Sequence, residues 1–262
     1  MRGTEIDSVN IRLNIEYNGK NYFGWQRQSE RKPSHSKNKP TIQQTIEEAL
    51  QVLFPEEKIS LIGAGRTDTG VHALGQVANF SLKSGSLHNK SLDRLKNSLN
   101  AILPSDISVT GISKCKPDFH SRYSAKKRVY VYYFSTRKSA VLSDFTYKLK
   151  TKFDIDLAKD YCKLLVGNND FRNYCKNKSD KHEFRSIVYY AKVSKLKNGI
   201  IKFEICANRF LHSMVRALAG VLLQVAVRKL TIEEFKNKFK KGEPLKIQYV
   251  PSNALFLKKI IY

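Results

Sequence analysis

The sequence has few cysteines and none of the segments that direct a chain into a membrane or out of the cell. Its four cysteines form no C-x-x-C pair, and no histidine lies at zinc-finger spacing from them. No apolar run approaches the roughly 18 residues that cross a bilayer, and residues 1–10 lack the apolar core of a secretory signal. We therefore expect a cytoplasmic protein with reduced thiols, no bound metal and no contact with a membrane.

Motifs for common cofactors and activated nucleophiles are also missing. The sequence contains no G-x-x-x-x-G-K-[ST], no G-x-S-x-G and no H-x-x-x-H. The run Gly63-Ala64-Gly65 begins like a dinucleotide-binding fingerprint, but the third glycine is misplaced and no helix is expected after it. A nucleotide-binding enzyme that uses this loop for phosphates is therefore a weak alternative, and we expect no cofactor.

Acidic residues are scarce relative to basic ones. The chain has 23 Asp and Glu against 47 Lys and Arg, which gives a formal net charge of +24. Such an excess indicates a polyanionic partner, and nucleic acid is preferred because no membrane segment is present. The alternative is a lysine-rich proteome, in which proteins of every function are basic.

The first half of the chain shows clear periodicity. Ile11, Leu13 and Ile15 alternate with polar residues, as in a half-buried strand. Thr41 and Gln44 form a capping box at the start of an amphipathic helix. The elements expected here are strands at 11–17, 58–62, 77–82 and 107–113, and helices at 42–54 and 92–103. Their β-α-β-β-α-β order allows a ferredoxin-like arrangement.

The second half repeats this order. Asn198-Gly199 is a strong hairpin signal, and a helix ending near residue 165 is capped by Asp154 or Asp156. The other elements expected here are strands at 128–135, 184–195, 200–206 and 255–262, and helices at 210–228 and 231–241. We predict an α+β fold of two ferredoxin-like halves related by pseudo-symmetry, residues 1–115 and 116–262, with a mixed or antiparallel central sheet, helices on one face and a ligand cleft.

A glycine-rich stretch at residues 63–76 stands out between two expected strands. It contains four glycines, with Arg66 and Asp68 near its middle. In an extended segment, residues two apart point to the same side, so the guanidinium and the carboxylate could share a pocket. The alternative is that Asp68 caps a turn and Arg66 is an ordinary surface residue.

Several segments together resemble a known family. The first is Gly65-Arg66-Thr67-Asp68-x-Gly70-Val71-His72-Ala73, which resembles the signature of tRNA pseudouridine synthases of the TruA type. The others, in chain order, are Tyr17-Asn18-Gly19, Gly24-Trp25-Gln26, Phe119–Ala125, Arg128–Tyr132 and Asn208–Arg216. The resemblance thus covers nearly the whole chain and implies the pseudouridine synthase fold.

The resemblance assigns roles to four residues. Asp68 matches the catalytic nucleophile, and Arg66 a partner for that carboxylate or for phosphate. Tyr130 matches the active-site tyrosine that contacts the target nucleotide, and Arg216 the arginine that pairs with the catalytic aspartate. These three, Arg66, Tyr130 and Arg216, are also the expected substrate-binding residues. Without the resemblance, Tyr130 would be assigned to the core and Arg216 to a helix surface.

The chain departs from the family pattern at several positions that carry no catalytic group. Thr69 stands where alanine is usual, Ser213 replaces a second histidine, Ala217 replaces an asparagine and Val129 replaces a second arginine. The basic segment 31–40 looks like an insertion and could follow phosphates.

The expected chemistry suits these residues. Converting uridine to pseudouridine breaks the N1–C1′ bond and forms C5–C1′, with no change of oxidation state and hence no need for a cofactor. An aspartate carboxylate is ordinarily ionised at neutral pH and needs no activating base. The target base must leave its stack, and Tyr130 could stack on it and take part in proton transfer from C5. The sequence leaves open whether Asp68 attacks C1′ or C6.

The resemblance also implies the substrate and the assembly. It predicts a homodimer that modifies uridines 38, 39 and 40 in the anticodon stem-loop of tRNA. Expected contacts to phosphates come from basic residues near the second expected domain's first strand, namely Lys126, Lys127, Arg128, Arg137 and Lys138. The alternative function is a non-catalytic RNA-binding or RNA-chaperone protein that keeps the fold.

Overall fold

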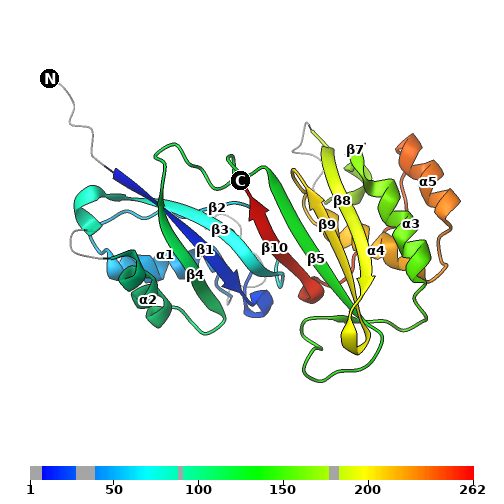
Figure 1. Ribbon diagram of the computed structural model, residues 1–262, viewed down its shortest axis with the longest axis horizontal. Coiled ribbons are helices and arrows are strands. Elements are labelled where there is room, and N and C mark those ends of the chain that lie inside the picture. Colours follow the sequence, from blue (N-terminus) through cyan, green and yellow to red (C-terminus); the bar gives the residue numbers. More distant parts are fainter. Residues whose placement is uncertain (1–7, 28–38, 88–90, 177–182) are drawn as a thin grey trace. The chain divides into compact units, whose positions relative to one another are not determined.

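The computed structural model describes residues 8–27, 39–87, 91–176 and 183–262 (Figure 1). Most of the basic 31–40 segment, residues 31–38, lies outside these ranges. The chain divides into two compact units, residues 1–126 with Tyr262, and residues 127–261. The first of these is unit 1 and the second is unit 2.

Unit 1 has the ferredoxin-like topology that its element order predicts. Its strands are β1 (Ser8–Tyr17), β2 (Ile62–Gly63), β3 (His72–Lys83) and β4 (Ile107–Cys115), and its helices are α1 (Ile42–Leu53) and α2 (Leu92–Ile102). The strands form an antiparallel sheet in the order β4-β1-β3-β2 (Figure 1). This confirms the β-α-β-β-α-β prediction for the first half.

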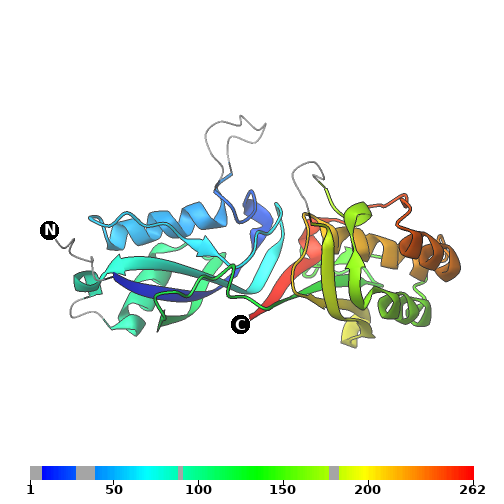
Figure 2. The ribbon, with the colours of Figure 1, turned by 90° about the horizontal axis from the view of Figure 1, so that it is seen from above.

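Both helices of unit 1 begin at side-chain caps and pack on one face of the sheet. The Thr41 hydroxyl accepts a hydrogen bond from the Gln44 amide, and the Ser91 hydroxyl accepts one from the Arg94 amide. α1 and α2 contact each other, and α1 runs along the sheet in Figure 2. The alternating residues Ile11, Leu13 and Ile15 of β1 are fully buried, so the apolar face of this strand forms the core.

Unit 2 repeats the topology of unit 1. Its strands are β5 (Lys127–Ser135), β6 (Tyr147–Lys148), β7 (Gly167–Asp170), β8 (Arg185–Lys195), β9 (Ile200–Ala207) and β10 (Leu255–Ile261), and its helices are α3 (Ile155–Leu165), α4 (Met214–Ala226) and α5 (Ile232–Lys241). The order β10-β5-β9-β8, extended by β7, is antiparallel throughout, and β6 pairs with β5 in parallel. The repeat expected from the sequence is confirmed at the level of topology.

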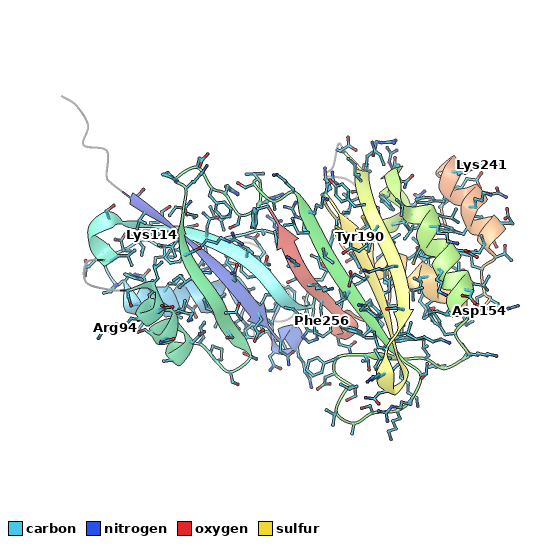
Figure 3. The ribbon with its side chains drawn as sticks, in the orientation of Figure 1. Arg94, Lys114, Asp154, Tyr190, Lys241 and Phe256 are labelled. Atoms are coloured by element: carbon cyan, nitrogen blue, oxygen red, sulfur yellow. The ribbon has the colours of Figure 1, made fainter. Side chains whose placement is uncertain are left out.

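The details of unit 2 follow its local signals. The side chain of Asp154, labelled in Figure 3, caps α3 by accepting from the amides of Asp156 and Leu157. Asn198 and Gly199 between β8 and β9 have φ values of 61° and 73°, as a tight hairpin turn requires. α3 contacts α4, so these helices share one face of the sheet.

A buried carboxylate lies at the centre of β9. Glu204 is almost fully buried and is surrounded by Lys258 (2.8 Å), Lys192 (3.3 Å) and Lys202 (3.5 Å). The hydroxyl of Tyr190, which is labelled in Figure 3, donates to it at 3.1 Å. Burial raises the pKa of Glu204, but the hydrogen bonds from Lys258 and Tyr190 and the lysine charges outweigh it and lower the pKa to about 2.

Several elements differ from the prediction. β3 begins at His72 rather than at 77, and β6 and β7 are not among the expected strands. β2 is much shorter than 58–62, because side chains of α1 satisfy the backbone of Leu61: its amide donates to Glu47 and its carbonyl accepts from Gln43, both at 3.0 Å. α4 begins at Met214 rather than at 210, because Ser213 has a φ of 59°, which no helix can contain.

The boundary between the units falls after residue 126, later in the chain than the expected 115/116. The segment between these points folds back onto unit 1, where the buried side chain of Asn10 donates to the carbonyls of Lys116 (3.1 Å) and Phe119 (2.8 Å). Within unit 1, the hydroxyl of Tyr262 also donates to the carbonyl of Ser121 at 3.0 Å. These bonds explain why residues 116–126 belong to the first unit.

All four cysteines are free thiols. Cys162, Cys175 and Cys206 are buried, and Cys115 is partly exposed at the end of β4. Within the described ranges, no cluster of three or more His, Cys, Asp or Glu side chains could hold a metal ion. Within the same ranges, no helix has the length and apolar character needed to cross a bilayer.

Candidate active site

Asp68 lies in the irregular chain between β2 and β3, at the first position of a tight turn. The amide of Val71 donates to the carbonyl of Asp68 at 3.1 Å, and Gly70 has a φ of 76°. A positive φ at the third position of such a turn favours glycine. The turn holds the Asp68 side chain in a half-buried position.

The residue before Asp68 is fixed from two sides. The hydroxyl of Thr67 hydrogen-bonds the buried hydroxyl of Tyr17 at 2.8 Å, and the carbonyl of Thr67 accepts from the amide of Trp25 at 3.2 Å. Gly24 has a φ of 80°, and a Cβ there would lie 2.5 Å from the same carbonyl. Burial raises the pKa of Tyr17, so its hydroxyl stays neutral and serves only as a hydrogen-bonding group.

The two ends of the loop are fixed as well. A Cβ on Gly63 would lie 2.4 Å from the indole of Trp25, so the ring packs directly on the backbone where β2 ends. The side chain of Gln76, fully buried in β3, donates to the carbonyl of Gly65 at 2.8 Å. The Gly19 amide donates to Nδ1 of His72 at 3.1 Å. The loop is therefore held by contacts from residues 17–25 and from β3.

Arg66 behaves differently from Asp68. Because it lies outside β2 and β3, the alternation of an extended strand does not apply to the two residues. The Arg66 side chain is exposed, and no hydrogen bond or ion pair of this residue occurs within the described ranges. An exposed guanidinium of this kind is suited to a phosphate.

Tyr130 lies on β5 in unit 2 and is only 8% exposed. Its neighbours across the sheet are Ile205 and Leu257. Its ring meets that of Phe210 edge to face, with centroids 5.1 Å apart and an angle of 85°. The ring is thus packed against the loop that leads into α4, and its orientation is defined by an aromatic contact.

Arg216 lies in the first turn of α4 and is partly buried. Its Nε donates to the carbonyl of Val250 at 2.9 Å. A Cβ on Gly220, one turn further along, would lie 1.9 Å from the carbonyl of Gln248, so α4 packs closely against this segment. Burial raises the pKa of the nearby Tyr132, although the charge of Arg216 opposes this shift. The guanidinium therefore has a fixed direction in unit 2.

The five basic residues expected to follow phosphates divide into two groups. Lys126 and Lys138 are exposed, and Lys127 places its ammonium 4.3 Å from the ring centre of Tyr189. Arg128 donates to the carbonyl of Asn208 at 2.8 Å, and Arg137 donates to the carbonyl of Asn198 at 2.9 Å. The two arginines thus also fix backbone, a role that the sequence did not reveal.

Comparison with known proteins decides the family. A family model described as tRNA pseudouridine synthase matches residues 14–124 and 161–262. The chain belongs to the tRNA pseudouridine synthase family. This confirms the resemblance based on sequence motifs. Asp68, Arg66 and Arg216 lie inside the matched ranges, whereas Tyr130 lies between them.

Curated relatives of this family match almost end to end. tRNA pseudouridine synthase A of Thermodesulfovibrio yellowstonii is 38% identical over 97% of this chain and 100% of its own. The enzymes of the same name from Caldicellulosiruptor bescii and Acetivibrio thermocellus are 38% and 37% identical, over 97% of this chain and 99% of theirs. A crystal structure of a Cbf5-Nop10-Gar1 complex gives a TM-score of 0.35 at 11% identity, covering 82% of this chain and 45% of that one.

The structure gives supporting roles to residues to which the sequence alone assigned none. Tyr17, Gly24 and Trp25 occur in motifs that resemble the family, and their contacts show that they hold the loop of Asp68. Phe210 packs on Tyr130 and belongs to the motif Asn208–Arg216. Val250, which directs Arg216, lies in no motif and carries no sequence signal, because only its backbone carbonyl is used.

Proposed function

We propose that this chain isomerises uridine to pseudouridine in the anticodon stem-loop of tRNA, at positions 38, 39 and 40, with Asp68 as the nucleophile. The observation that carries the proposal is the rigid loop in which Asp68 lies, within the signature of the family. A preorganised carboxylate needs no rearrangement before it reacts, which is how enzymes lower the cost of the transition state.

The reaction requires one covalent role from the protein. The carboxylate of Asp68 adds to C1′ or to C6 of an extruded uridine, the N1–C1′ bond breaks, and the base rotates so that C5 bonds to C1′. The bond between the carboxylate and C1′ or C6 breaks in turn, which regenerates the free carboxylate of Asp68. The proton on C5 is then lost and N1 gains one, so the product is an isomer of the substrate. No redox group or cofactor takes part.

The other three residues have supporting roles in this proposal. Arg66 binds a phosphate next to the target nucleotide, which its exposed guanidinium supports. Tyr130 contacts the target nucleotide, which the fixed plane of its ring supports. Arg216 compensates the charge of the catalytic carboxylate, and its bond to Val250 supports a defined direction for the guanidinium.

The proposal extends to the setting of the reaction. We expect tRNA as the partner, with exposed Lys126 and Lys138 among the groups that meet its phosphates. We further expect a homodimer in the cytoplasm. We assign the nucleophile to the first domain and Tyr130 and Arg216 to the second.

The test compares wild type with Asp68→Asn. We expect the wild type to release tritium from unmodified tRNA that carries [5-³H]uridine, and Asp68→Asn to release none while it still binds the tRNA. Asp93→Asn is the matched control, because Asp93 is an exposed aspartate of the same unit, with 88% of its side chain accessible. Normal turnover by Asp68→Asn would show that another group is the nucleophile.

The same assay separates the alternative function. A non-catalytic RNA-binding protein would bind the tRNA but release no tritium even as wild type. Membership of a family of isomerases argues against this outcome.

A further inference from the structure

An exposed tyrosine in unit 1 has no role in the proposed chemistry. Tyr123 lies in the segment after β4, and 76% of its surface is accessible, compared with 40% for Tyr189. Such exposure of a large aromatic ring contributes little to folding. The residue is part of the Phe119–Ala125 motif, to which the proposed reaction assigns no role.

The backbone that carries Tyr123 is rigid. The amide of Ser124 donates to the carbonyl of His120 at 2.9 Å, and the amide of His120 donates to the hydroxyl of Ser124 at 3.1 Å. Nδ1 of His120 accepts from the amides of Arg122 at 3.2 Å and Tyr123 at 3.3 Å. The backbone of the exposed residue is thus held by its own turn.

The ring itself is also positioned. It stacks obliquely on the imidazole of His120, with centroids 4.3 Å apart, and the guanidinium carbon of Arg122 lies 5.6 Å from its centre. These contacts limit the rotamers of Tyr123 while most of its surface faces solvent. Because the side chain is already ordered, a ligand that stacks on it loses less entropy on binding.

The turn is attached to the face of the sheet opposite the helices. The amide of Ser121 donates to the side chain of Asn79 at 2.8 Å, and Asn79 donates to Asn10 at 3.0 Å. Asn79 lies opposite Arg12 in the sheet, and both asparagines are buried. The turn that carries the exposed ring is therefore anchored to two buried asparagines that are hydrogen-bonded to each other.

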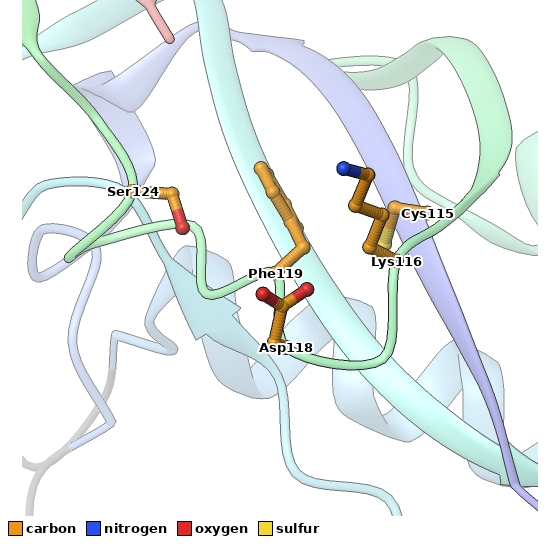
Figure 4. Close-up of a pocket in the computed structure, with 5 residues that line it drawn as sticks. All are labelled: Cys115, Lys116, Asp118, Phe119 and Ser124. Atoms are coloured by element: carbon orange, nitrogen blue, oxygen red, sulfur yellow. The ribbon is translucent and has the colours of Figure 1, made fainter.

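A shallow pocket adjoins this turn. It has a volume of about 370 Å³ and is lined by Cys115 and Lys116 at the end of β4 and by Asp118, Phe119 and Ser124 of the turn (Figure 4). Lys116 offers a cation and Asp118 an acceptor for amino groups. The turn thus combines a flat ring, cations and a hollow, which are the features of a surface for single-stranded nucleic acid.

We propose that Tyr123, with His120 and Arg122, forms a stacking platform for an unpaired base of tRNA other than the target uridine. The proposal rests on the proposed function, which makes tRNA the partner. The charge of the chain supports the same occupant, because its net charge is +24, Arg122 is exposed beside the ring, and Lys126 is exposed three residues further along the chain. Bases of any type can stack on such a ring, so the platform adds affinity without reading sequence.

The geometry of β3 separates the platform from the nucleophile. Asn79, which anchors the turn, lies seven residues after His72, where β3 begins next to the loop of Asp68. At about 3.3 Å per residue, this corresponds to about 23 Å along the strand. The turn that carries Tyr123 is thus anchored away from the start of β3, and we expect the platform to affect substrate binding rather than the chemical step.

The test measures the Kd and the kinetics of Tyr123 variants with an unmodified tRNA transcript carrying [5-³H]uridine. For Tyr123→Ala we expect a Kd and a KM about 5- to 150-fold higher, the range for loss of one stacked base, with kcat unchanged. Tyr123→Phe keeps the flat ring and should bind within about twofold of wild type. Tyr123→Leu keeps apolar bulk without a flat face and should behave like Tyr123→Ala.

Each other outcome overturns the proposal. If Tyr123→Ala or Tyr123→Leu binds tRNA like wild type, no base stacks there. If Tyr123→Ala instead changes the oligomeric state in light scattering, the ring serves contact between copies of the chain. The proposed function has a separate readout: it fails if the wild type releases no tritium, and the Kd series still decides the platform. Thermal unfolding of each variant, expected to be unchanged at so exposed a site, shows that the fold is intact.

Discussion

The packing of Trp25 on Gly63 gives a sharp prediction for Gly63→Ala. The new Cβ would lie 2.4 Å from Cε2 and Nε1 of the indole and 2.6 Å from Cζ2, whereas carbon atoms in contact are normally about 3.5–4.0 Å apart. The ring must therefore move by about 1 Å or the backbone must shift.

Neither group can move easily. The amide of Trp25 donates to Thr67, its carbonyl accepts from Gln43, and the indole is 2% exposed. On the other side, Gly63 pairs with Ala78 in the sheet. Overpacking of this kind costs about 1–3 kcal/mol. At about 2–4 °C per kcal/mol for a chain of this size, the melting temperature should fall by about 2–12 °C.

The assay follows from the composition, because Trp25 is the only tryptophan in the chain. Its fluorescence reports this contact alone, and we expect a shifted emission maximum in Gly63→Ala together with the lower melting temperature. Because the same ring lies beside the loop of Asp68, release of tritium should also fall.

Gly65→Ala is the matched control, two residues away in the same loop. A Cβ there meets nothing within 4 Å, and Gly65 is not among the glycines with a positive φ. This variant should be as stable as wild type or about 0.4–1 kcal/mol more stable, because alanine has less conformational freedom in the unfolded chain. Equal melting temperatures and emission spectra for Gly63→Ala and wild type would refute the packing argument.

Two further predictions concern the turn of Asp68 and the buried carboxylate of β9. Gly70→Ala places a side chain at a φ of 76°, which should lower the free energy of unfolding by about 1–2 kcal/mol and also lower kcat. Thr69→Ala, at the preceding position, should keep both stability and kcat near wild type. Glu204→Gln should lower the free energy of unfolding by about 1–3 kcal/mol at pH 7, measured by urea unfolding, because a charged group with several partners is removed. Because the folded pKa of Glu204 is about 2, below its usual value of about 4.3, this contribution is present above pH 4.3 and is lost as the pH falls towards 2. A difference between Glu204→Gln and wild type that stays constant from pH 7 to pH 2.5 would contradict this assignment.

Much of the architecture was predictable because its signals are local. The caps Thr41, Ser91 and Thr231 and the hairpin at Asn198 each act through residues within a few positions in the chain. The order of elements then limited the topology to a repeated ferredoxin-like arrangement, which the structure confirms in both units. The periodicity of apolar residues predicts a helix or strand correctly when that element depends mainly on its own residues.

One error arose where distant groups replaced a strand partner, and another where a local backbone conformation is not visible in the apolar pattern. The strand expected at 58–62 is mostly absent because Glu47 and Gln43 of α1 take the place of a strand partner at Leu61. The helix expected from residue 210 begins later, since apolar residues continue through the loop while Ser213 adopts a left-handed conformation that periodicity does not reveal. Neither the side-chain bonds to Leu61 nor the conformation of Ser213 can be inferred from the spacing of apolar residues.

The candidate site shows the same division. Family motifs predicted Asp68 and Arg66 as site residues, but the sequence could not reveal that Tyr17, Gly24 and Trp25, from a distant part of the chain, hold the loop. The carbonyl of Val250, which orients Arg216, is invisible to any pattern because every residue has one.

The placement of the thiols has a practical consequence for studying RNA binding in solution. Three cysteines are buried, whereas Cys115 is partly exposed and borders the pocket next to the Tyr123 turn. Burial raises the pKa of Cys115, so maleimide labelling at mildly alkaline pH is slow but selective for this position. A dye attached there, without any engineered mutation, would sense by its emission or anisotropy when a nucleotide enters the hollow.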